Sequence, residues 1–477
     1  MPDRNVDEMP AAARRRALLG LLVVCLGTIA APLDSAVNIA FPSITQRFGL
    51  AVTDIRWIAI VYVLTYASLL LIFGRLGDLV GHRIVFQIGL LTATLGFAGC
   101  AAASSYELLL GARVLQGIGI ALTLSCAPAL ATSLYDERER TRILGIYAAM
   151  TALGGVIGPL AGGLLVERFG WSAVFWARIP LVAGALALSW TIPPRPGQGS
   201  SSGLDLVGSV QLAVAMCGLI GGLVIKAPVA GPLGWLLPLG LIGIGGISLV
   251  AFVQRQSRHA SPIIRPALFR DPPFTLMNIA SVVANFATFG VVLIVPFYLV
   301  GIVRLETSVA GVVLSLAALG TIAGSALAPG VIARLGGMAT AATGMLLSSA
   351  GLLGIAMWSL HTPIAPMVPA LLLQGFGMGL FLVAYTDLVT ATLPVAERGV
   401  AGSLTMLTRS IGIITGAAGL SALHGMFEAA SRSDNATPID AFMAGFQAAL
   451  AGAAVLQLAA LGIGFAMLRS RGQVHRN

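Results

Sequence analysis

An acidic residue stands inside the first long apolar segment of the chain, where a charge is costly. Asp34 lies in the run 33–42, and Asn38, four residues further on, shares its helical face. An ionisable residue within a membrane span marks a functional site by default. Loss of water disfavours a charged carboxylate, so such a group can bind and release a proton near neutral pH. A structural ion pair or an acid at the membrane surface is the alternative interpretation.

Arg113 is the partner expected for Asp34. If the first span runs outward and the fourth runs inward, Asp34 lies about nine residues before an outer end and Arg113 about six or seven residues after one. At 1.5 Å of rise per residue, both lie roughly 10–14 Å below the outer surface. Equal depth allows contact, and Arg113 would then compete with a proton for Asp34. The alternative is that Arg113 is a fixed strut between helices.

A short glycine-rich turn is expected between the second and third spans. Its candidate residues are Gly74, Gly77, Asp78, Gly81 and Arg83. Glycines allow a tight turn, and a carboxylate such as Asp78 is favoured at the N-terminus of a helix. These features predict a latch that holds the outward-facing state. An ordinary polar turn that fixes topology is the alternative.

A second glycine motif lies within the fifth span. Gly154, Gly158 and Gly162 follow one another at four-residue intervals, and Gly163 and Pro159 belong to the same motif. A stripe of small residues lets another helix approach closely, and Pro159 removes a backbone donor and can kink the helix. The motif predicts a mobile contact between helices. Packing alone is the alternative.

Several polar residues within apolar segments are candidates for lining a substrate cavity: Asn38, Gln116, Asn278, Asn285, Gln374, Asp387 and Arg409. Asn278 and Asn285 share a helical face, so they could bind substrate or bond to a neighbouring helix. Asp387 and Arg409 could pair, unless Asp387 is simply hydrated.

The composition excludes a large soluble protein. Apolar residues make up 57% of the 477 residues, charged residues make up 10%, and the mean hydropathy is +0.93. A soluble domain carries about 25% charged residues. Apolar runs about 20 residues long, which suffice to cross roughly 30 Å of hydrocarbon, recur along the whole chain. The first run resembles a signal peptide, but it continues through Pro42, which predicts an uncleaved span.

The predicted fold is an all-α polytopic membrane protein. About fourteen spans are expected, at 17–41, 55–76, 84–104, 107–131, 142–165, 171–193, 206–226, 234–254, 273–300, 308–329, 338–359, 366–391, 399–422 and 441–468. An even number puts both termini on one side. Most of the 28 Lys and Arg residues fall on that side, which predicts that both termini are cytoplasmic.

The spans divide into two six-helix bundles and an inserted pair. The predicted parts are a cytoplasmic N-terminal tail 1–16, a bundle 17–193, a Pro-, Gly- and Ser-rich cytoplasmic linker 194–205, an inserted helix pair 206–254, a basic cytoplasmic loop 255–272, a bundle 273–468 and a cytoplasmic tail 469–477.

The two bundles carry matching sequences. The run Gly-Arg-Leu-Gly-Asp at 74–78 returns as Ala-Arg-Leu-Gly-Gly at 333–337, and Gln-Gly-Ile-Gly at 116–119 returns as Gln-Gly-Phe-Gly at 374–377. Such parallel repeats are typical of secondary transporters.

Other classes of chemistry find little support. The four cysteines have no Cys-x-x-Cys spacing and the five histidines no metal-ligand spacing, so neither a metal site nor a disulfide framework is expected. There is no Walker A motif, which argues against direct ATP drive, and no serine, histidine and acid constellation, which argues against an enzyme. The net charge of +9 is scattered among loops, which argues against nucleic acid as a partner.

At these residues the chain resembles the major facilitator superfamily, and within it the fourteen-helix drug:H⁺ antiporter family. The matching motifs are 74–83 for the loop, 110–119 for the fourth span, 154–163 for the antiporter motif and 33–42 for the first span. The resemblance implies two bundles plus two inserted helices, alternating access and a monomer in the bacterial cytoplasmic membrane. The proton gradient would supply the energy without a cofactor.

The chain departs from the family pattern at four positions. Leu79 and His82 stand where basic residues are usual, Arg178 where Asn is common, and Val300 where Gln is frequent. The expected function is proton-coupled export of drugs or antibiotic-like small molecules. A proton-coupled metabolite symporter is the first alternative, against which the glycine-proline motif argues. A non-transporting membrane sensor is the second, against which the short termini argue.

Overall fold

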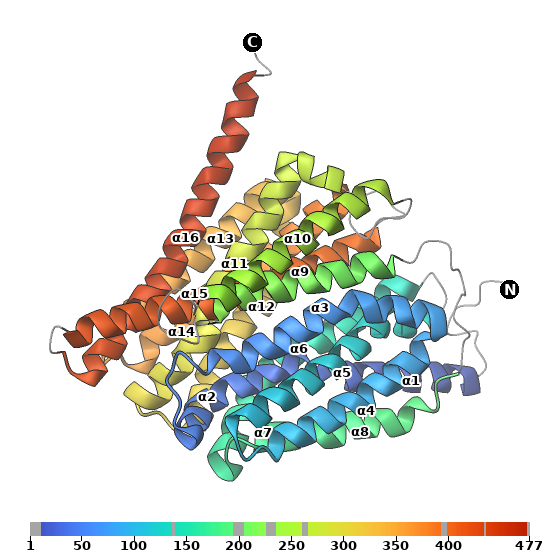
Figure 1. Ribbon diagram of the computed structural model, residues 1–477, viewed down its shortest axis with the longest axis horizontal. Coiled ribbons are helices and arrows are strands. Elements are labelled where there is room, and N and C mark those ends of the chain that lie inside the picture. The colour runs from blue at the N-terminus through green and yellow to red at the C-terminus, as the bar shows by residue number, and fades with distance from the viewer. Residues whose placement is uncertain are drawn as a thin grey trace. The chain divides into compact units, whose positions relative to one another are not determined.

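The computed structural model of the chain is helical. It describes residues 11–135, 139–193, 205–225, 235–259, 266–392, 398–433 and 436–474, and no strand occurs within those ranges. There, 12 helices are long and apolar enough to cross a membrane, and the two shorter apolar helices are Ala173–Ser189 and Val207–Gly222. The predicted all-α architecture of fourteen spans is therefore confirmed (Figure 1).

The chain divides into two compact units. The first comprises Met1–Ala40, Val61–Arg255 and His259–Ser261, and the second comprises Phe41–Ile60, Gln256–Arg258 and Pro262–Asn477. The first ten helices in chain order, with one 3₁₀ turn, are α1 (Ala11–Ile29), η2 (Pro32–Asp34), α2 (Ser35–Phe48), α3 (Arg56–Val80), α4 (His82–Ala101), α5 (Tyr106–Ser133), α6 (Arg140–Phe169), α7 (Ala173–Trp176), α8 (Arg178–Ser189), α9 (Leu206–Val224) and α10 (Leu236–Arg258).

The later elements belong to the second unit. They are the 3₁₀ turn η5 (Pro266–Arg270), α11 (Pro272–Phe297), the π-helical turn η6 (Tyr298–Ile302), α12 (Thr307–Leu335), α13 (Gly337–Ala356), α14 (Ile364–Thr392), α15 (Arg398–Ser433) and α16 (Pro438–Val474).

Glycines let helices within the first unit approach closely. A Cβ on Gly96 of α4 would lie 2.6 Å from the backbone of Gln116 on α5, and one on Gly89 would lie 2.7 Å from Leu122. Helices with side chains at these positions could not pack so near. The resulting contact fixes Gln116 against α4.

The second unit repeats this packing. A Cβ on Gly351 of α13 would collide with the backbone of Gln374 on α14, so this pair matches Gly96 and Gln116. In each unit one pair of consecutive spans is also separated by one residue only, a glycine with positive φ: Gly81 (φ 101°) between α3 and α4, and Gly336 (φ 82°) between α12 and α13. Only glycine adopts this backbone readily.

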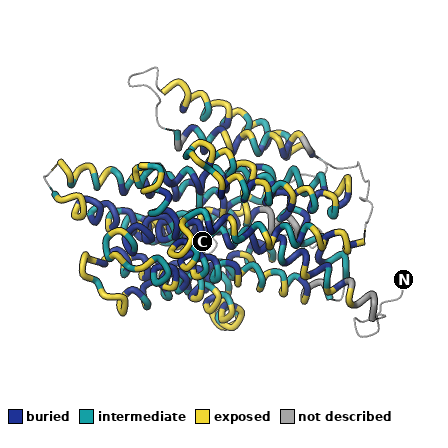
Figure 2. The backbone as a smooth tube through the Cα atoms, turned by 90° about the horizontal axis from the view of Figure 1, so that it is seen from below, coloured by how far each residue is buried: buried dark blue, intermediate teal, exposed yellow. Residues whose placement is uncertain are grey.

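Apolar side chains also cover the outside of the helices. Figure 2 shows buried residues gathered along some helix faces and exposed residues on others. Ile247 and Phe465 are 74% and 68% exposed, and many leucines resemble them. Such an apolar surface is suited to contact with lipid. Lipid offers no hydrogen-bond partners, so the backbone polar groups must be paired within the helices.

Two spans are interrupted where the sequence predicts unbroken helices. The span predicted over 17–41 is present, but it breaks into α1, η2 and α2 around Pro32. The span predicted over 171–193 breaks into α7 and α8 at Ala177, three residues before Pro180. Proline lacks a backbone donor and obstructs the preceding turn, which accounts for a break near each proline.

Candidate functional site

Asp34 lies at the end of the interruption in the first span and contacts Arg113 of α5. Arg113 donates through Nη1 to Oδ1 and through Nη2 to Oδ2, each at 2.7 Å. This bidentate geometry is the strongest form of an arginine–carboxylate pair. The contact anticipated from equal depth in the membrane is therefore present.

A second arginine holds the same carboxylate. Arg178, the first residue of α8, donates through Nη1 to Oδ1 of Asp34 at 2.7 Å. This role was not anticipated from the sequence, because it depends on the helix break at Ala177. The available signal was a lone arginine between the apolar residues of Trp-Ala-Arg-Ile-Pro at 176–180, at a position where Asn is common.

Gln116 completes the cluster instead of standing apart as a cavity residue. Its Nε2 donates to Asp34 Oδ1 at 3.1 Å, and its Oε1 accepts a hydrogen bond from Arg113 Nη1 at 3.0 Å. The Cys100 thiol also donates to that oxygen, at 3.6 Å. Asp34, Arg113, Arg178 and Gln116 are called the Asp34 cluster below.

Aromatic rings enclose the two guanidinium groups. The Cζ atom of Arg113 lies 4.3 Å from the ring centre of Tyr62, and that of Arg178 lies 5.2 Å from Phe97. Phe175 lies within 6.0 Å of both. A cation over an aromatic face gains additional stabilisation, and more so without water. The rings therefore help to keep two cations in the interior.

The cluster contains one carboxylate and two guanidinium groups, so its charge is +1 while Asp34 is ionised. The side chains of Arg113 and Arg178 are 1% and 3% exposed, while that of Asp34 is 14% exposed. Within the described part of the chain, Arg178 Nη2 is buried without a hydrogen-bond partner. Protonation of Asp34 in this arrangement would leave two buried cations uncompensated, which is strongly unfavourable.

The glycine motif of α6 packs directly on the interruption that carries Asp34. A Cβ on Gly154 would lie 2.7 Å from Pro32, one on Gly158 would collide with Ser35 Oγ, and one on Gly162 would lie 2.7 Å from Ala36. Pro159 and Gly163 are buried in the same stretch. The glycine motif and Asp34 are far apart in the sequence, but the motif packs directly against the residues on either side of Asp34.

The loop motif is mostly helical, which corrects the turn expected over it. Gly74, Gly77 and Asp78 lie on α3, and Gly81 alone separates α3 from α4. Asp78 lies 3.8 Å from Arg75 and 3.5 Å from His82, the first residue of α4. A Cβ on Gly77 would approach His82 and Cys126 to 2.6 and 2.7 Å. The junction at Gly81 therefore places Asp78 beside the start of α4, where a negative charge is favoured.

The two ends of the loop motif differ in their surroundings. Arg83 donates to the Trp190 carbonyl at 3.3 Å, which ties the start of α4 to the residue that follows α8. Gly74 lies on α3, and a Cβ added there would have Ser125 alone within 4 Å. Gly74 is therefore less crowded than Gly77. The latch itself stays a prediction.

The candidates in the second unit do not form a charged site. Asn278 and Asn285 each donate at 2.8 Å to a carbonyl of their own helix, and Asn278 Oδ1 accepts a bond from Tyr385 at 3.0 Å. Asp387 and Arg409 are both exposed, and no ion pair between them occurs among the described residues.

Gln374 and Asn38 complete the sequence candidates. Gln374 donates to Thr288 at 3.1 Å, and Asn38 is half-buried on α2, one turn beyond Asp34. Within the described ranges, no group of three or more His, Cys, Asp or Glu side chains is placed to hold a metal ion.

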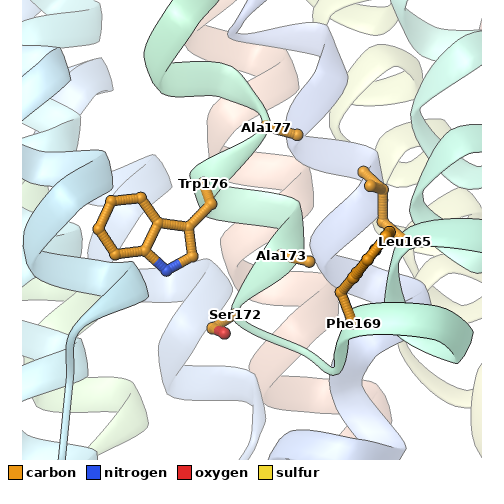
Figure 3. Close-up of a pocket in the computed structure, with 6 residues that line it drawn as sticks. All are labelled: Leu165, Phe169, Ser172, Ala173, Trp176 and Ala177. Atoms are coloured by element: carbon orange, nitrogen blue, oxygen red, sulfur yellow. The ribbon is translucent and has the colours of Figure 1, made fainter.

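A shallow hollow of about 400 Å³ lies at the turn between α6 and α7 (Figure 3). Its lining is almost wholly apolar: Leu165, Phe169, Ser172, Ala173, Trp176 and Ala177. Figure 3 shows Trp176 on one side of α7 and Leu165 with Phe169 on the other. The polar side-chain groups of the hollow are the Ser172 hydroxyl and the Trp176 indole N–H. The hollow therefore offers little for proton or ion chemistry, and the Asp34 cluster remains the candidate site.

Known proteins share both the sequence pattern and the fold. The model of the Major Facilitator Superfamily matches residues 23–417. The tetracenomycin C resistance and export protein of Streptomyces glaucescens is 31% identical over 88% of this chain and 78% of its own length. The riboflavin transporter RibZ of Clostridioides difficile is 24% identical over 83% of this chain and 86% of its own length.

A solved structure gives the same architecture. A bacterial homologue of the human lysosomal transporter Spinster, in an inward-facing and unoccupied conformation, has a TM-score of 0.70. It is 17% identical and covers 97% of this chain and 98% of its own. The repeated bundles, the helical fold and the family match agree: this chain is a multi-pass membrane transporter of the Major Facilitator Superfamily.

Proposed function

We propose that the protein is a proton-coupled antiporter that exports drugs or antibiotic-like small molecules. The observation that carries this proposal is the Asp34 cluster, in which one buried carboxylate is held by two arginines and a glutamine. Asp34 would bind the proton, and Arg113 and Arg178 would compete with that proton. Gln116 would position the carboxylate.

The energies decide when the proton can bind. Removing the partner of a buried ion pair costs about 3–5 kcal/mol. One pH unit of proton gradient supplies only about 1.4 kcal/mol per proton. A proton therefore cannot displace the arginines while the cluster stays assembled. Asp34 takes up a proton in a second conformation in which the guanidinium groups have withdrawn, and reassembly of the cluster expels it.

The α6 contact would link this chemistry to movement. Gly154, Gly158 and Gly162 place the backbone of α6 against Pro32, Ser35 and Ala36, on either side of Asp34. A shift of α6 would consequently move the backbone that carries the acid. Alternating access requires such a link between proton occupancy and the position of helices.

The charge of the cluster bears on the substrate. A single positive charge repels a cation about 8 Å away by about 2 kcal/mol at an effective dielectric constant of 20. An anion would bind better once Asp34 is protonated, which favours transport of the anion and the proton in the same direction. By the same reasoning a cation would bind better while Asp34 is ionised, which favours exchange against protons, although the charge of +1 weakens its binding.

Relatives support export but leave a second candidate. A resistance and export protein and a riboflavin transporter both match most of the chain. The glycine-proline motif of α6 favours export, whereas the positive cluster would suit symport of an anionic metabolite with a proton. The direction of flux in vesicles separates the two functions.

The remaining features of the proposal follow the family. The protein would lie in the bacterial cytoplasmic membrane with both termini in the cytoplasm, act as a monomer and use the proton gradient without a cofactor. The inserted pair would be α9 and α10, which Arg255 joins by a bond to Asp205 at 2.5 Å.

The test is a drug-sensitivity panel in an efflux-deficient bacterium, followed by substrate-induced proton movement in inside-out vesicles. The wild type is compared with Asp34→Asn and, as a matched control, with Asp440→Asn, which changes an exposed acid in the first turn of α16. Resistance in the wild type and the control, lost in Asp34→Asn at equal membrane expression, supports the proposal. Equal resistance in the wild type, the control and Asp34→Asn would show that Asp34 does not couple protons to export. Proton and substrate moving in the same direction in vesicles would indicate symport.

A further inference from the structure

A second titratable pair lies on α15, far along the chain from the Asp34 cluster. His424 is 1% exposed, and among the described residues neither of its ring nitrogens has a hydrogen-bond partner. Its Nδ1 lies 3.6 Å from Oε2 of Glu428, one helical turn further on. The proposed antiport does not use this pair.

The imidazole is enclosed by α16. The ring of Phe442 meets it edge-on with the centres 5.0 Å apart, and a Cβ on Gly445 would lie 3.0 Å from His424 Cδ2. A buried polar group without a partner is unusual in folded proteins and calls for an explanation. Packing alone would be served better by an apolar side chain of the same size.

The pair is connected to the surface by its own helix. Glu428 is 19% exposed, and its Oε1 accepts a hydrogen bond from Arg432 Nη2 at 2.6 Å. Arg432 is 60% exposed. His424, Glu428 and Arg432 follow at four-residue intervals on one face of α15. A proton can therefore reach the imidazole along the partly exposed carboxylate.

Few other charges lie on the elements that pack against α15. α11 has none, and on α14 the single charged residue is Asp387, near the end remote from this pair. α16 carries Asp440 in its first turn, where it accepts a bond from Thr437 at 2.6 Å. At the start of α3, Arg56 donates to Ser421, one turn before His424, at 2.8 Å. Thr53 lies 3.1 Å from a Cβ on Gly425, so Asp54 also lies in a segment beside this part of α15. Glu428 is the acid in direct contact with the imidazole.

We propose that His424 and Glu428 form a second proton-binding site, in the second unit and independent of the Asp34 cluster. A proton from water adds to the free ring nitrogen of the neutral imidazole, and no bond is broken. The resulting imidazolium carries a hydrogen on each nitrogen, so Nδ1 donates to the Glu428 carboxylate. The contact between His424 Nδ1 and Glu428 Oε2, now 3.6 Å apart, thereby becomes an ion pair with a charge-assisted hydrogen bond.

The experiment is a histidine titration by nuclear magnetic resonance on the full-length protein in lipid nanodiscs. Histidines are isotopically labelled, and the pH is lowered from about 8 to about 5, the range in which an imidazole is expected to protonate. Loss of one resonance in His424→Gln assigns the signal. A variant with the other four histidines replaced by Gln, which leaves His424 as the sole reporter, serves if His424→Gln fails to fold.

The expected result is that the His424 signal titrates within this range. In Glu428→Gln it should need at least about a tenfold higher proton concentration, because the neighbouring negative charge is gone. His361→Gln, which alters a histidine outside α15, should leave the titration unchanged. A signal that does not move, or that titrates identically in Glu428→Gln, overturns the proposal. The titration requires no transport, so it stands or falls separately from Asp34-coupled export.

Discussion

The two units use corresponding glutamines for different chemistry. Gln116 and Gln374 occupy matching positions, each fixed by a glycine on the preceding helix, Gly96 or Gly351. Gln116 donates to the carboxylate of Asp34, whereas Gln374 donates to the hydroxyl of Thr288. The repeat thus preserves the packing of a glycine against each glutamine, whereas the group that the glutamine contacts is charged in the first unit and neutral in the second.

The interior of the second unit is polar but uncharged at the place where its helices meet. Tyr385 donates to Asn278 at 3.0 Å and lies 3.2 Å from Thr408, which in turn lies 3.0 Å from Ser281. Hydroxyl and amide groups bind helices together without the desolvation cost of ions. The comparison teaches that corresponding positions of one scaffold hold an ionic cluster around Gln116 and neutral hydrogen bonds around Gln374.

The largest effect should come from Arg113→Ala. This change removes both hydrogen bonds of the bidentate pair and should reduce substrate-driven proton movement in inside-out vesicles at least about 100-fold, in line with the cost of breaking a buried pair. Arg270→Ala, which removes an exposed arginine of the second unit, should change this proton movement less than about twofold. If the two variants were equally impaired, the contrast between the units would be lost.

The next largest effect should come from Gly158→Ala. The added methyl group would collide with Ser35 beside Asp34, and overpacking of this kind costs about 1–3 kcal/mol, so exchange should slow about tenfold or more. Gly155→Ala is the matched control, because nothing lies within 4 Å of its Cβ. Exchange rates are compared at equal amounts of inserted protein. Loss of insertion in Gly158→Ala alone would indicate that the contact serves folding only.

Much of the fold is readable from the sequence, because hydropathy is a local property. The fourteen spans follow from it, and the contact between Asp34 and Arg113 follows from depth along two helices. Depth does not reveal helix rotation, so the bond from Gln116 to Asp34 could not be foreseen. The role of Arg178 depends on a helix break at Ala177, and the His424 pair on how α15 and α16 pack. These are tertiary facts.

A moderate effect is expected from Arg178→Gln, which lowers the charge of the Asp34 cluster from +1 to 0. Protons then compete with one guanidinium instead of two, so the pH at which exchange is half-maximal should rise by about one unit or more. Cationic compounds should also become better substrates. Exchange is measured between about pH 5 and 9 with neutral and cationic dyes. An unchanged profile would show that Arg113 alone governs the acid.

The smallest effect is expected from Tyr385→Phe in the second unit. Losing neutral hydrogen bonds costs about 1 kcal/mol, so the purified protein should unfold a few degrees lower and transport should fall less than about threefold. Thermal unfolding and vesicle flux are measured on the same preparation. A loss of coupling as large as that of Arg113→Ala would show that the Tyr385 hydrogen bonds take part in coupling.

The interruption of the first span affects how often its backbone hydrogen bonds open. Around Pro32 the amides of Ala31 and Asp34 bond three residues back, to Thr28 and Ala31, instead of four. Such short turns open more easily than the helices on either side. In hydrogen–deuterium exchange, the peptide that spans this interruption should therefore become labelled earlier than its neighbours in α1 and α2. Asp34 would then lie on the segment of the span whose backbone hydrogen bonds open most often.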